Sequence, residues 1–550
     1  MDSNSFLANL EYSLKTNWDY PALSDFKAAT LTYGDVARKI ARIHLVFEAC
    51  GLNKGDKVSI IGRNSAHWGV TFLATLSYGA VAVPILHEFK PDNVHHIVTH
   101  SESRILFAGN SSWESLDESQ MTGLEAIILI DDFSILKSGR KEVFDIRQEI
   151  DELEKERFPK GFGPEDIKFH RDQREELALI NYTSGTTGFS KGVMLPYRSL
   201  LSNMLFAEEA LPDMKHGDSV VSMLPTAHMY GMAFEFLFEF LKGCQVHFLT
   251  RAPTPKIILE AFASIKPTLV ISVPLIVEKI YKKQLLPAIN KPFVRLAMKL
   301  PVVDKRILKR INEKLTNFFG GNFFEVIVGG AAFNPDAEKL FRRIGFKYTV
   351  GYGMTECAPI ISYEIWDKIP MFSCGKAAPR MEIKIDSNDP ENIPGEIVVR
   401  GDNVMLGYYK NKEATDECMK DGWLYTGDLG IIDRNGYLYI KGRSKNMLLG
   451  PSGQNIYPEE IESRYNNDNY VSESLIIDSG GKLIALVFPD FDAAYRDGLS
   501  NDDIEKKLEE TRILINSELP HYSQISRVKI YPEEFEKTPK KSIKRFLYQV

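Results

Sequence analysis

Apolar residues follow two different spacings along the first 110 positions. Between residues 35 and 50 they recur every three to four positions, as in a helix, and Gly51 ends that segment. A second helical segment covers 66–78, between short, mainly apolar runs at 58–61 and 81–84. Apolar runs of the same kind return at 126–130, 177–182, 220–223, 269–273 and 326–328. Strands that alternate with helices predict an α/β fold with a largely parallel sheet.

The pattern changes after residue 383 to short β-rich segments separated by turn pairs, at 396–400, 429–433 and 437–441. These segments predict a small β-barrel-like region. A helix, a strand and a further helix follow at 458–465, 483–488 and 501–519. We therefore predict an α/β fold with a large N-terminal body of α/β subdomains, residues 1–442. A small mobile α+β domain, residues 443–550, would follow it.

Composition narrows the class of protein. The 550 residues are 44% apolar and 26% charged, which is ordinary for a globular chain. The chain has 67 lysines and arginines and 74 acidic residues, which gives a net charge of −7. Because a nucleic-acid-binding protein usually has an excess of basic residues, we expect no nucleic-acid partner. The five cysteines include no Cys-x-x-Cys pair, which favours a reducing compartment. The N-terminus lacks a signal-peptide pattern and no apolar run reaches the ~18–20 residues of a membrane span, so we expect a soluble cytoplasmic protein.

The segment 182–192, Tyr-Thr-Ser-Gly-Thr-Thr-Gly-Phe-Ser-Lys-Gly, directly follows an apolar strand. Its glycines let several backbone N–H groups turn towards one point, and its hydroxyls and Lys191 add donors and positive charge. These are the groups that a polyphosphate requires, although a flexible surface loop is the simpler alternative. A P-loop NTPase is excluded because its signature needs Gly-Lys-Ser/Thr, whereas this chain has Ser190-Lys191-Gly192.

The segment 182–192 resembles the phosphate-binding loop of the adenylate-forming superfamily, which includes acyl-CoA synthetases, luciferases and peptide-synthetase adenylation domains. Four further segments resemble that superfamily's motifs in the same order: Val-Gly-Gly-Ala-Ala at 328–332, Gly-Tyr-Gly-Met-Thr-Glu at 351–356, Tyr-Thr-Gly-Asp at 425–428 and Gly-Arg-Ser-Lys-Asn-Met at 442–447. Because the five segments cover most of the chain in order, we identify it as a member of this superfamily.

The resemblance implies ATP, Mg²⁺ and CoA as cofactors and assigns residues to each. The phosphates of ATP would be held by Thr183, Ser184, Gly185, Thr186, Thr187, Gly188 and Lys191. The adenine side would be formed by Gly329, Gly330, Ala331, Tyr352 and Gly353. Tyr352 would stack on the base, or would be an ordinary buried tyrosine with a hydrogen-bonded hydroxyl.

The remaining assignments concern the metal, the ribose and the hinge. Thr183 and Glu356 would hold Mg²⁺, because this ion takes one or two protein oxygens beside phosphate oxygens. Thr355 would contact the α-phosphate. The other implied roles are ribose binding by Asp428 with a further donor from Arg443, a domain hinge at Lys445, and a lining for the pantetheine of CoA that includes Gly453. An exposed lysine at the end of a strand would look the same as a hinge at Lys445.

Two catalytic assignments are open. The superfamily places a lysine in a Thr-Pro-x-x-Lys setting near its C-terminus, where it neutralises charge during adenylation. Here Ser542 occupies that place, and Lys541 beside it is our candidate; a basic solvated tail is the alternative. His228 lies where the superfamily has a residue near the acyl carboxylate and pyrophosphate, although a lone histidine is more often structural.

Three segments bear on the acyl substrate. The segment 231–238 is rich in methionine and phenylalanine, which suits an aliphatic chain but also an ordinary core helix. The segment 272–281 resembles that of long-chain acyl-CoA synthetases. From 278 to 314 the chain has eleven lysines and arginines against three acidic residues, a net charge of +8. A basic amphipathic helix in this segment predicts a contact with a membrane surface. The alternative is that the helix packs its apolar stripe on the body and exposes its lysines and arginines.

We therefore predict an AMP-forming long-chain-fatty-acid–CoA ligase, with a medium- to long-chain fatty acid as partner substrate. Within the same fold, the alternatives are an acyl-AMP ligase that loads acyl carrier protein, an aryl-acid CoA ligase and a luciferase-like oxygenase. A non-catalytic protein that binds nucleotide or acyl-AMP is the alternative from another class. The sequence leaves the oligomeric state open.

Overall fold

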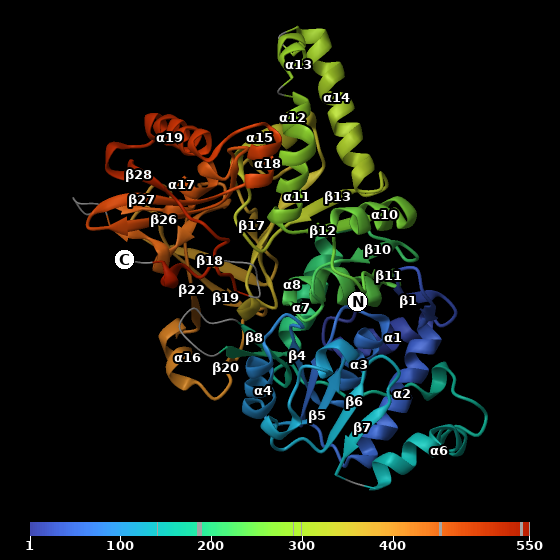
Figure 1. Ribbon diagram of the computed structural model, residues 1–550. Helices are drawn as coiled ribbons and strands as arrows, with labels where there is room; N and C mark the ends of the chain where they lie inside the picture. The colour runs from blue at the N-terminus through green and yellow to red at the C-terminus, as the bar shows by residue number, and fades with distance from the viewer. Residues whose placement is uncertain are drawn as a thin grey trace.

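The computed structural model describes residues 1–139, 141–183, 190–289, 291–298, 300–449, 454–538 and 543–548. A large body contains the N-terminal sheets and helices, and a smaller domain of C-terminal segments lies beside it (Figure 1). The predicted α/β class with a large N-terminal body and a smaller C-terminal domain is confirmed.

An eight-stranded sheet forms the lower part of the body, in the order β20-β9-β8-β4-β3-β5-β6-β7. Its strands are β3 (Lys57–Ile61), β4 (Val81–Ile85), β5 (Ser103–Ala108), β6 (Ala126–Leu129), β7 (Ile135–Ser138), β8 (Leu177–Thr183), β9 (Lys191–Pro196) and β20 (Gly407–Tyr408). The central pairings are parallel, whereas β7, β9 and β20 add antiparallel strands at the two ends. The largely parallel sheet expected from the sequence therefore has antiparallel margins.

Local side-chain chemistry sets the helix ends of this subdomain. Thr32 and Asp35 form a reciprocal capping box at the start of α2 (Tyr33–Ala49). Ser65 caps α3 (Ala66–Tyr78), and Gly79, with a left-handed φ of 85°, ends it. The other α-helices among the described residues up to 210 are α1 (Phe6–Thr16), α4 (Pro91–His100), α5 (Asn110–Trp113), α6 (Lys141–Arg157) and α7 (Tyr197–Ala210).

Two smaller sheets continue the body towards its upper part. One has the order β10-β11-β1-β2, from β10 (Ser219–Ser222), β11 (Gln245–Phe248), β1 (Pro21–Asp25) and β2 (Thr30–Thr32). The other is parallel, from β12 (Leu269–Ser272), β13 (Glu325–Val328) and β14 (Tyr348–Val350). Their helices are α8 (Met229–Met232), α9 (Phe238–Lys242), α10 (Pro255–Ile265), α11 (Pro274–Ile280) and α15 (Pro335–Ile344).

The β-rich part expected after residue 383 is an antiparallel sheet around one long strand. β22 (Trp423–Ile432) pairs with β19 (Gly395–Gly401), β21 (Met419–Lys420) and β23 (Leu438–Arg443), and β19 pairs with β18 (Met381–Asp386). A three-stranded sheet precedes it, from β15 (Tyr352–Gly353), β16 (Ile360–Tyr363) and β17 (Lys376–Ala377), and α16 covers Lys412–Cys418.

The smaller domain has its own hydrophobic cores. Its elements are β24 (Leu448–Leu449), β25 (Asn455–Ile456), α17 (Pro458–Tyr465), β26 (Val471–Ser479), β27 (Lys482–Pro489), α18 (Phe491–Arg496), α19 (Asn501–Glu518) and β28 (Ile525–Ile530). One large cluster of buried residues extends from Phe6 to Leu438, and two separate clusters lie between Ile456 and Phe535. The predicted boundary at 442 lies between these clusters and stays a prediction.

Three helices form an arm that extends away from the body, at the top of Figure 1. They are α12 (Leu286–Ile289), α13 (Pro292–Ala297) and α14 (Pro301–Phe318). We call these three helices together the arm. Among the described residues, no helix is long and apolar enough to cross a membrane.

Candidate active site

One cavity of about 2360 Å³ lies where the body meets the smaller domain. It collects every described residue that the sequence assigned to nucleotide, metal or catalysis. These are Thr183, Lys191, His228, Gly329, Gly330, Ala331, Tyr352, Gly353, Thr355, Glu356, Asp428, Arg443 and Lys445. Ser184, Gly185, Thr186, Thr187, Gly188, Gly453 and Lys541 lie outside the described residues. Segments more than 200 residues apart in sequence therefore converge on one site.

The two ends of the expected phosphate loop lie side by side. Thr183 is the last residue of β8, Lys191 is the first of β9, and the antiparallel register pairs them directly. The Nζ atom of Lys191 lies 5.0 Å from the ring centre of Tyr408. This hairpin brings a hydroxyl and a cation to the cavity wall, as a polyphosphate site requires.

Glu356 is a buried carboxylate on the cavity wall, held by a tyrosine that the sequence analysis did not identify. The hydroxyl of Tyr408 donates to Oε1 of Glu356 at 2.9 Å. Burial and the Glu356 charge both raise the pKa of Tyr408, so it stays a donor. Glu356 and Thr183 offer one carboxylate and one hydroxyl beside a phosphate site, a donor set that fits Mg²⁺. A Gly-Tyr-Tyr run at 407–409 was the available signal in the sequence.

Asp428 on β22 is held by two donors, one on β15 and one on β23. The hydroxyl of Tyr352 donates to Oδ2 at 2.7 Å, and Nε of Arg443 lies 3.1 Å from Oδ1. Asp428 and Arg443 are cross-strand partners on β22 and β23, which explains their proximity. Burial raises the pKa of the Asp428 carboxyl, and the charge of Arg443 opposes that rise. The hydroxyl of Tyr352 is thus hydrogen-bonded, and Tyr352 is one of the residues that line the cavity.

The glycines of the 328–332 segment make room for a tyrosine. A Cβ atom on Gly329 would lie 3.0 Å from the ring of Tyr230, closer than ordinary packing allows. The Tyr230 hydroxyl donates to the carbonyl of Ile327 at 3.1 Å, which fixes the ring against this segment. Gly330 has a left-handed φ of 87°, which favours glycine. Residues 329–332 of this segment line the cavity.

His228 has a structural role and also lies at the cavity. It precedes α8, and its Nδ1 accepts a hydrogen bond from the backbone N–H of Tyr230 at 3.3 Å. The histidine also lines the cavity. Both interpretations of His228 therefore remain compatible with its position.

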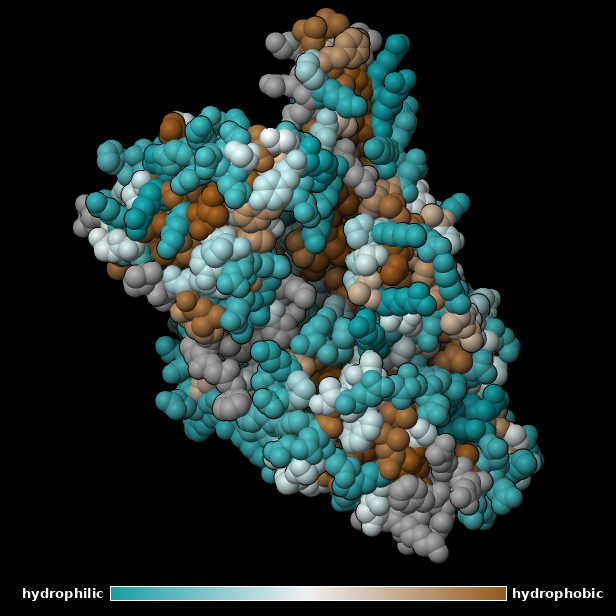
Figure 2. Space-filling view, viewed as in Figure 1, coloured by the Kyte–Doolittle hydropathy of each residue, from teal (hydrophilic) through white to brown (hydrophobic). Residues whose placement is uncertain are grey.

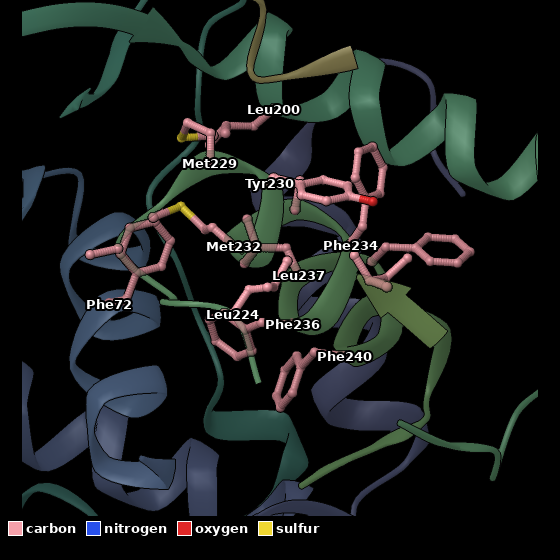
Figure 3. Packing of buried hydrophobic residues seen from close by; sticks show 14 of the residues in the cluster. Phe72, Leu200, Leu224, Met229, Tyr230, Met232, Phe234, Phe236, Leu237 and Phe240 are labelled. Carbon is pink, nitrogen blue, oxygen red and sulfur yellow. The ribbon is translucent and has the colours of Figure 1, made fainter. Parts of the chain in front are cut away.

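The 231–238 segment is mainly core. Met232, Phe236 and Phe238 are fully buried, and Figure 3 shows Met232, Phe236 and Phe240 packed together with Phe72 of α3. Phe234 differs, because it lines the cavity. Most of the segment is therefore a core helix, one of the two alternatives. Phe234 alone has the position expected of an acyl-pocket wall among these phenylalanines.

The smaller domain contributes charged groups to the same cavity. Lys445 is exposed at its edge, in the turn that follows β23. Arg545, which the sequence analysis did not select, is an ion-pair partner of the buried Glu462, with Glu459 at 3.9 Å. Asn467 donates to Oδ2 of Asp336 in the body at 2.6 Å and accepts from Asn334.

Comparison with known proteins places these observations in a family. Residues 10–409 match the protein family described as "AMP-binding enzyme", and residues 446–548 match the family described as "AMP-binding enzyme C-terminal domain". The chain is 25% identical to the long-chain-fatty-acid–CoA ligase FadD15 of Mycobacterium bovis, over 96% of this chain and 91% of that one. It is 27% identical to long-chain-fatty-acid–CoA ligase 5 of Rattus norvegicus, over 88% and 78% of the two chains.

A solved anthranilate CoA ligase, AuaEII in complex with anthranoyl-AMP, superposes with a TM-score of 0.80. It is 20% identical and covers 100% of this chain and 97% of its own. The resemblance drawn from the sequence is confirmed, and the expected cofactors ATP, Mg²⁺ and CoA agree with this family.

Proposed function

The chain belongs to the AMP-binding enzyme family, as an adenylate-forming CoA ligase, and from this premise we propose that it activates medium- to long-chain fatty acids. In the proposed reaction, a carboxylate oxygen of the fatty acid attacks the α-phosphorus of ATP, and pyrophosphate leaves. The thiolate of CoA then attacks the carbonyl carbon of the acyl-adenylate, which gives the acyl-CoA thioester and releases AMP. ATP and CoA are consumed as substrates.

The described residues can act on the first step mainly by positioning and charge neutralisation. Lys191 and Thr183 would bind phosphate oxygens, and Thr355 would contact the α-phosphate. Asp428, held by Tyr352 and Arg443, would accept hydrogen bonds from the ribose hydroxyls. Lys541 stays the proposed lysine of the adenylation step.

Mg²⁺ bound by Glu356 and Thr183 would neutralise charge on the phosphates. Tyr408 would keep the Glu356 carboxylate in its orientation through the 2.9 Å hydrogen bond. This chain's own contribution is therefore a fixed carboxylate next to a cationic hairpin.

The observation that carries the fatty-acid proposal is an aromatic wall next to the nucleotide side of the cavity. Tyr230, which contacts Gly329, makes an edge contact with Phe234 at 6.3 Å between ring centres. Phe234 contacts Phe206 at 6.0 Å, and Phe206 contacts Tyr363 at 5.5 Å. Other apolar side chains on the cavity wall are Leu211, Ile271 and Phe318. An apolar wall that begins at the proposed adenylation centre suits a long aliphatic chain.

Acid-dependent ATP–pyrophosphate exchange tests this proposal. We expect exchange with octanoate and palmitate, little with benzoate, and acyl-CoA formation when CoA is added. Glu356→Gln should abolish exchange, whereas Glu382→Gln, the same change at an exposed surface carboxylate, should leave the rate unchanged.

Each alternative predicts a different result from the same acid panel. Exchange with benzoate or anthranilate and not with palmitate would identify an aryl-acid CoA ligase, the class to which the structural relative AuaEII belongs by name. Exchange with palmitate but thioester formation on carrier protein alone would identify an acyl-AMP ligase. Nucleotide binding without exchange for any acid would identify a binding protein. Cytoplasmic location stays a prediction.

A further inference from the structure

The end of the arm presents large apolar side chains to solvent. Phe293 is 81% exposed, more than any other large hydrophobic side chain in the described residues, and Leu296 and Leu300 are 65% and 58% exposed. Phe293 and Leu296 are three residues apart in α13, which places them on one side of that helix. Leu300 directly precedes α14. Figure 2 shows hydrophobic atoms gathered at this end of the arm, at the top of the view. We call these three residues the tip.

The arm also presents a row of cations along α14. Exposed on this helix are Lys305, Arg306, Lys309, Arg310 and Lys314. Within α14, the Nζ atom of Lys309 lies 3.9 Å from a carboxylate oxygen of Glu313, a distance at which an exposed pair contributes little. On a chain with a net charge of −7, this is a strongly positive local surface.

The opposite face of α14 packs on the body towards its C-terminal end. Leu315 is 1% exposed, and Leu308 and Ile311 are half-buried against the main core. Asn312 donates to the carbonyl of Gly345 at 3.1 Å. The apolar stripe of α14 therefore packs on the body, as one of the two expectations had it. A membrane-surface contact stays a prediction, and the tip lies beyond the part of α14 that packs on the body.

We propose that the arm docks the protein on an anionic lipid bilayer, with the tip in the interfacial region and the α14 cations at lipid phosphates. Apolar side chains next to a cationic helix face are the combination that interfacial segments use, because burial of the apolar groups and attraction to anionic headgroups add together. The charge complementarity favours a membrane over an apolar protein groove.

The position of the arm gives this docking a consequence for substrate supply. Leu275, Ile276 and Ile280 of α11, which precedes the arm, line the cavity, as does Phe318 at the last residue of α14. The helix that precedes the arm and the last residue of the arm therefore both line the cavity. Delivery of a fatty acid from the bilayer rests on the proposed function, whereas docking itself does not.

Flotation of the full chain with phosphatidylcholine vesicles, with and without phosphatidylglycerol, tests the proposal. We expect binding to the anionic vesicles at low salt that falls as salt rises. Phe293→Ser with Leu296→Ser should weaken binding at least about 100-fold, from the transfer energy of two large apolar side chains. The matched control, Ile513→Ser with Leu514→Ser, changes side chains that are 59% and 64% exposed in the smaller domain and should bind as the unchanged protein does.

A second pair of variants tests the cations. Lys309→Gln with Arg310→Gln should weaken binding about 30-fold, from the general contribution of each cation near an anionic surface. Arg527→Gln with Lys529→Gln removes the same charge from an exposed strand of the smaller domain and should not change binding.

No binding to anionic vesicles at low salt would overturn the proposal, and so would equal losses in the arm and control variants. Equal binding to neutral and anionic vesicles would overturn the role of the cations. Acyl-CoA formation from dissolved fatty acid, without vesicles, should be unchanged in every arm variant. An absence of that activity in the unchanged protein would contradict the proposed function and leave the flotation result intact.

Discussion

Replacing Tyr408 with phenylalanine removes one hydroxyl and leaves the ring that faces Lys191 in place. The lost contact is the 2.9 Å hydrogen bond to Oε1 of Glu356, the proposed Mg²⁺ ligand. A hydrogen bond to a charged group contributes about 1.5–3 kcal/mol, which is about ten- to a hundred-fold in an equilibrium constant. Loss of a partner that orients a metal ligand has effects of the same size. We therefore expect Tyr408→Phe to require about ten- to a hundred-fold more Mg²⁺ for half-maximal activity.

The assay is a Mg²⁺ titration of ATP–pyrophosphate exchange at saturating fatty acid. Tyr409→Phe is the matched control, because the neighbouring hydroxyl donates at 3.1 Å to Glu102 at the surface. That variant should titrate as the unchanged protein does. Equal Mg²⁺ dependence in both variants would show that Tyr408 does not orient Glu356, and would refute the assignment of this carboxylate as an oriented metal ligand.

Three further predictions concern charge, space and burial. Arg443→Gln removes the cation whose charge opposes the raised pKa of Asp428. The pKa of Asp428 should therefore rise further, and the acid limb of the pH profile of KM for ATP should move to higher pH. Gly329→Ala should destabilise the protein by about 1–3 kcal/mol, as overpacking does, because the new Cβ meets the Tyr230 ring; thermal unfolding measures this. Burial raises the pKa of Glu239 to about 8. The folded state therefore keeps a proton that the unfolded state loses from about pH 4 upwards, and stability should fall as pH rises towards 8. Glu239→Gln should remove that fall in urea unfolding at pH 5 and pH 8.

Each of the three has a control or a contrary outcome. An unchanged pH profile in Arg443→Gln would show that this cation does not act on Asp428. For the glycine, Gly139→Ala places its Cβ 3.9 Å from the backbone oxygen of Glu125, an ordinary contact distance, and this variant should unfold as the unchanged protein does. If Glu239→Gln changed stability equally at both pH values, ionisation of Glu239 would not be the cause.

Features set by neighbours in sequence could be predicted well. The expected helix at 66–78 matches α3, because Ser65 and Gly79 act within one turn of its ends. The strand expected at 269–273 is β12 (Leu269–Ser272), because a buried parallel strand is a nearly continuous apolar run. Hydrophobic periodicity and helix caps depend only on residues that are close in sequence, so both can be recognised in a single sequence.

The missed site residues have distant partners. Tyr408 acts on Glu356, which lies 52 positions earlier, and Arg545 pairs with Glu462, 83 positions earlier. Nothing near either residue in sequence marks that partner. In the 231–238 segment the difficulty is a different one. Phe234 and Phe236 are the same residue type in the same apolar segment, and only their positions around the helix decide that Phe234 lines the cavity while Phe236 is buried in the core.

The exposed tip of the arm also affects how the purified protein will behave. Phe293, Leu296 and Leu300 remain in water when no bilayer is present, and apolar groups in water associate with one another. Two molecules that meet through their tips would give a particle whose size grows with protein concentration and shrinks when mild detergent is added. A mass measured at one concentration in plain buffer would then report this self-association, so a true oligomeric state needs measurement both with and without detergent.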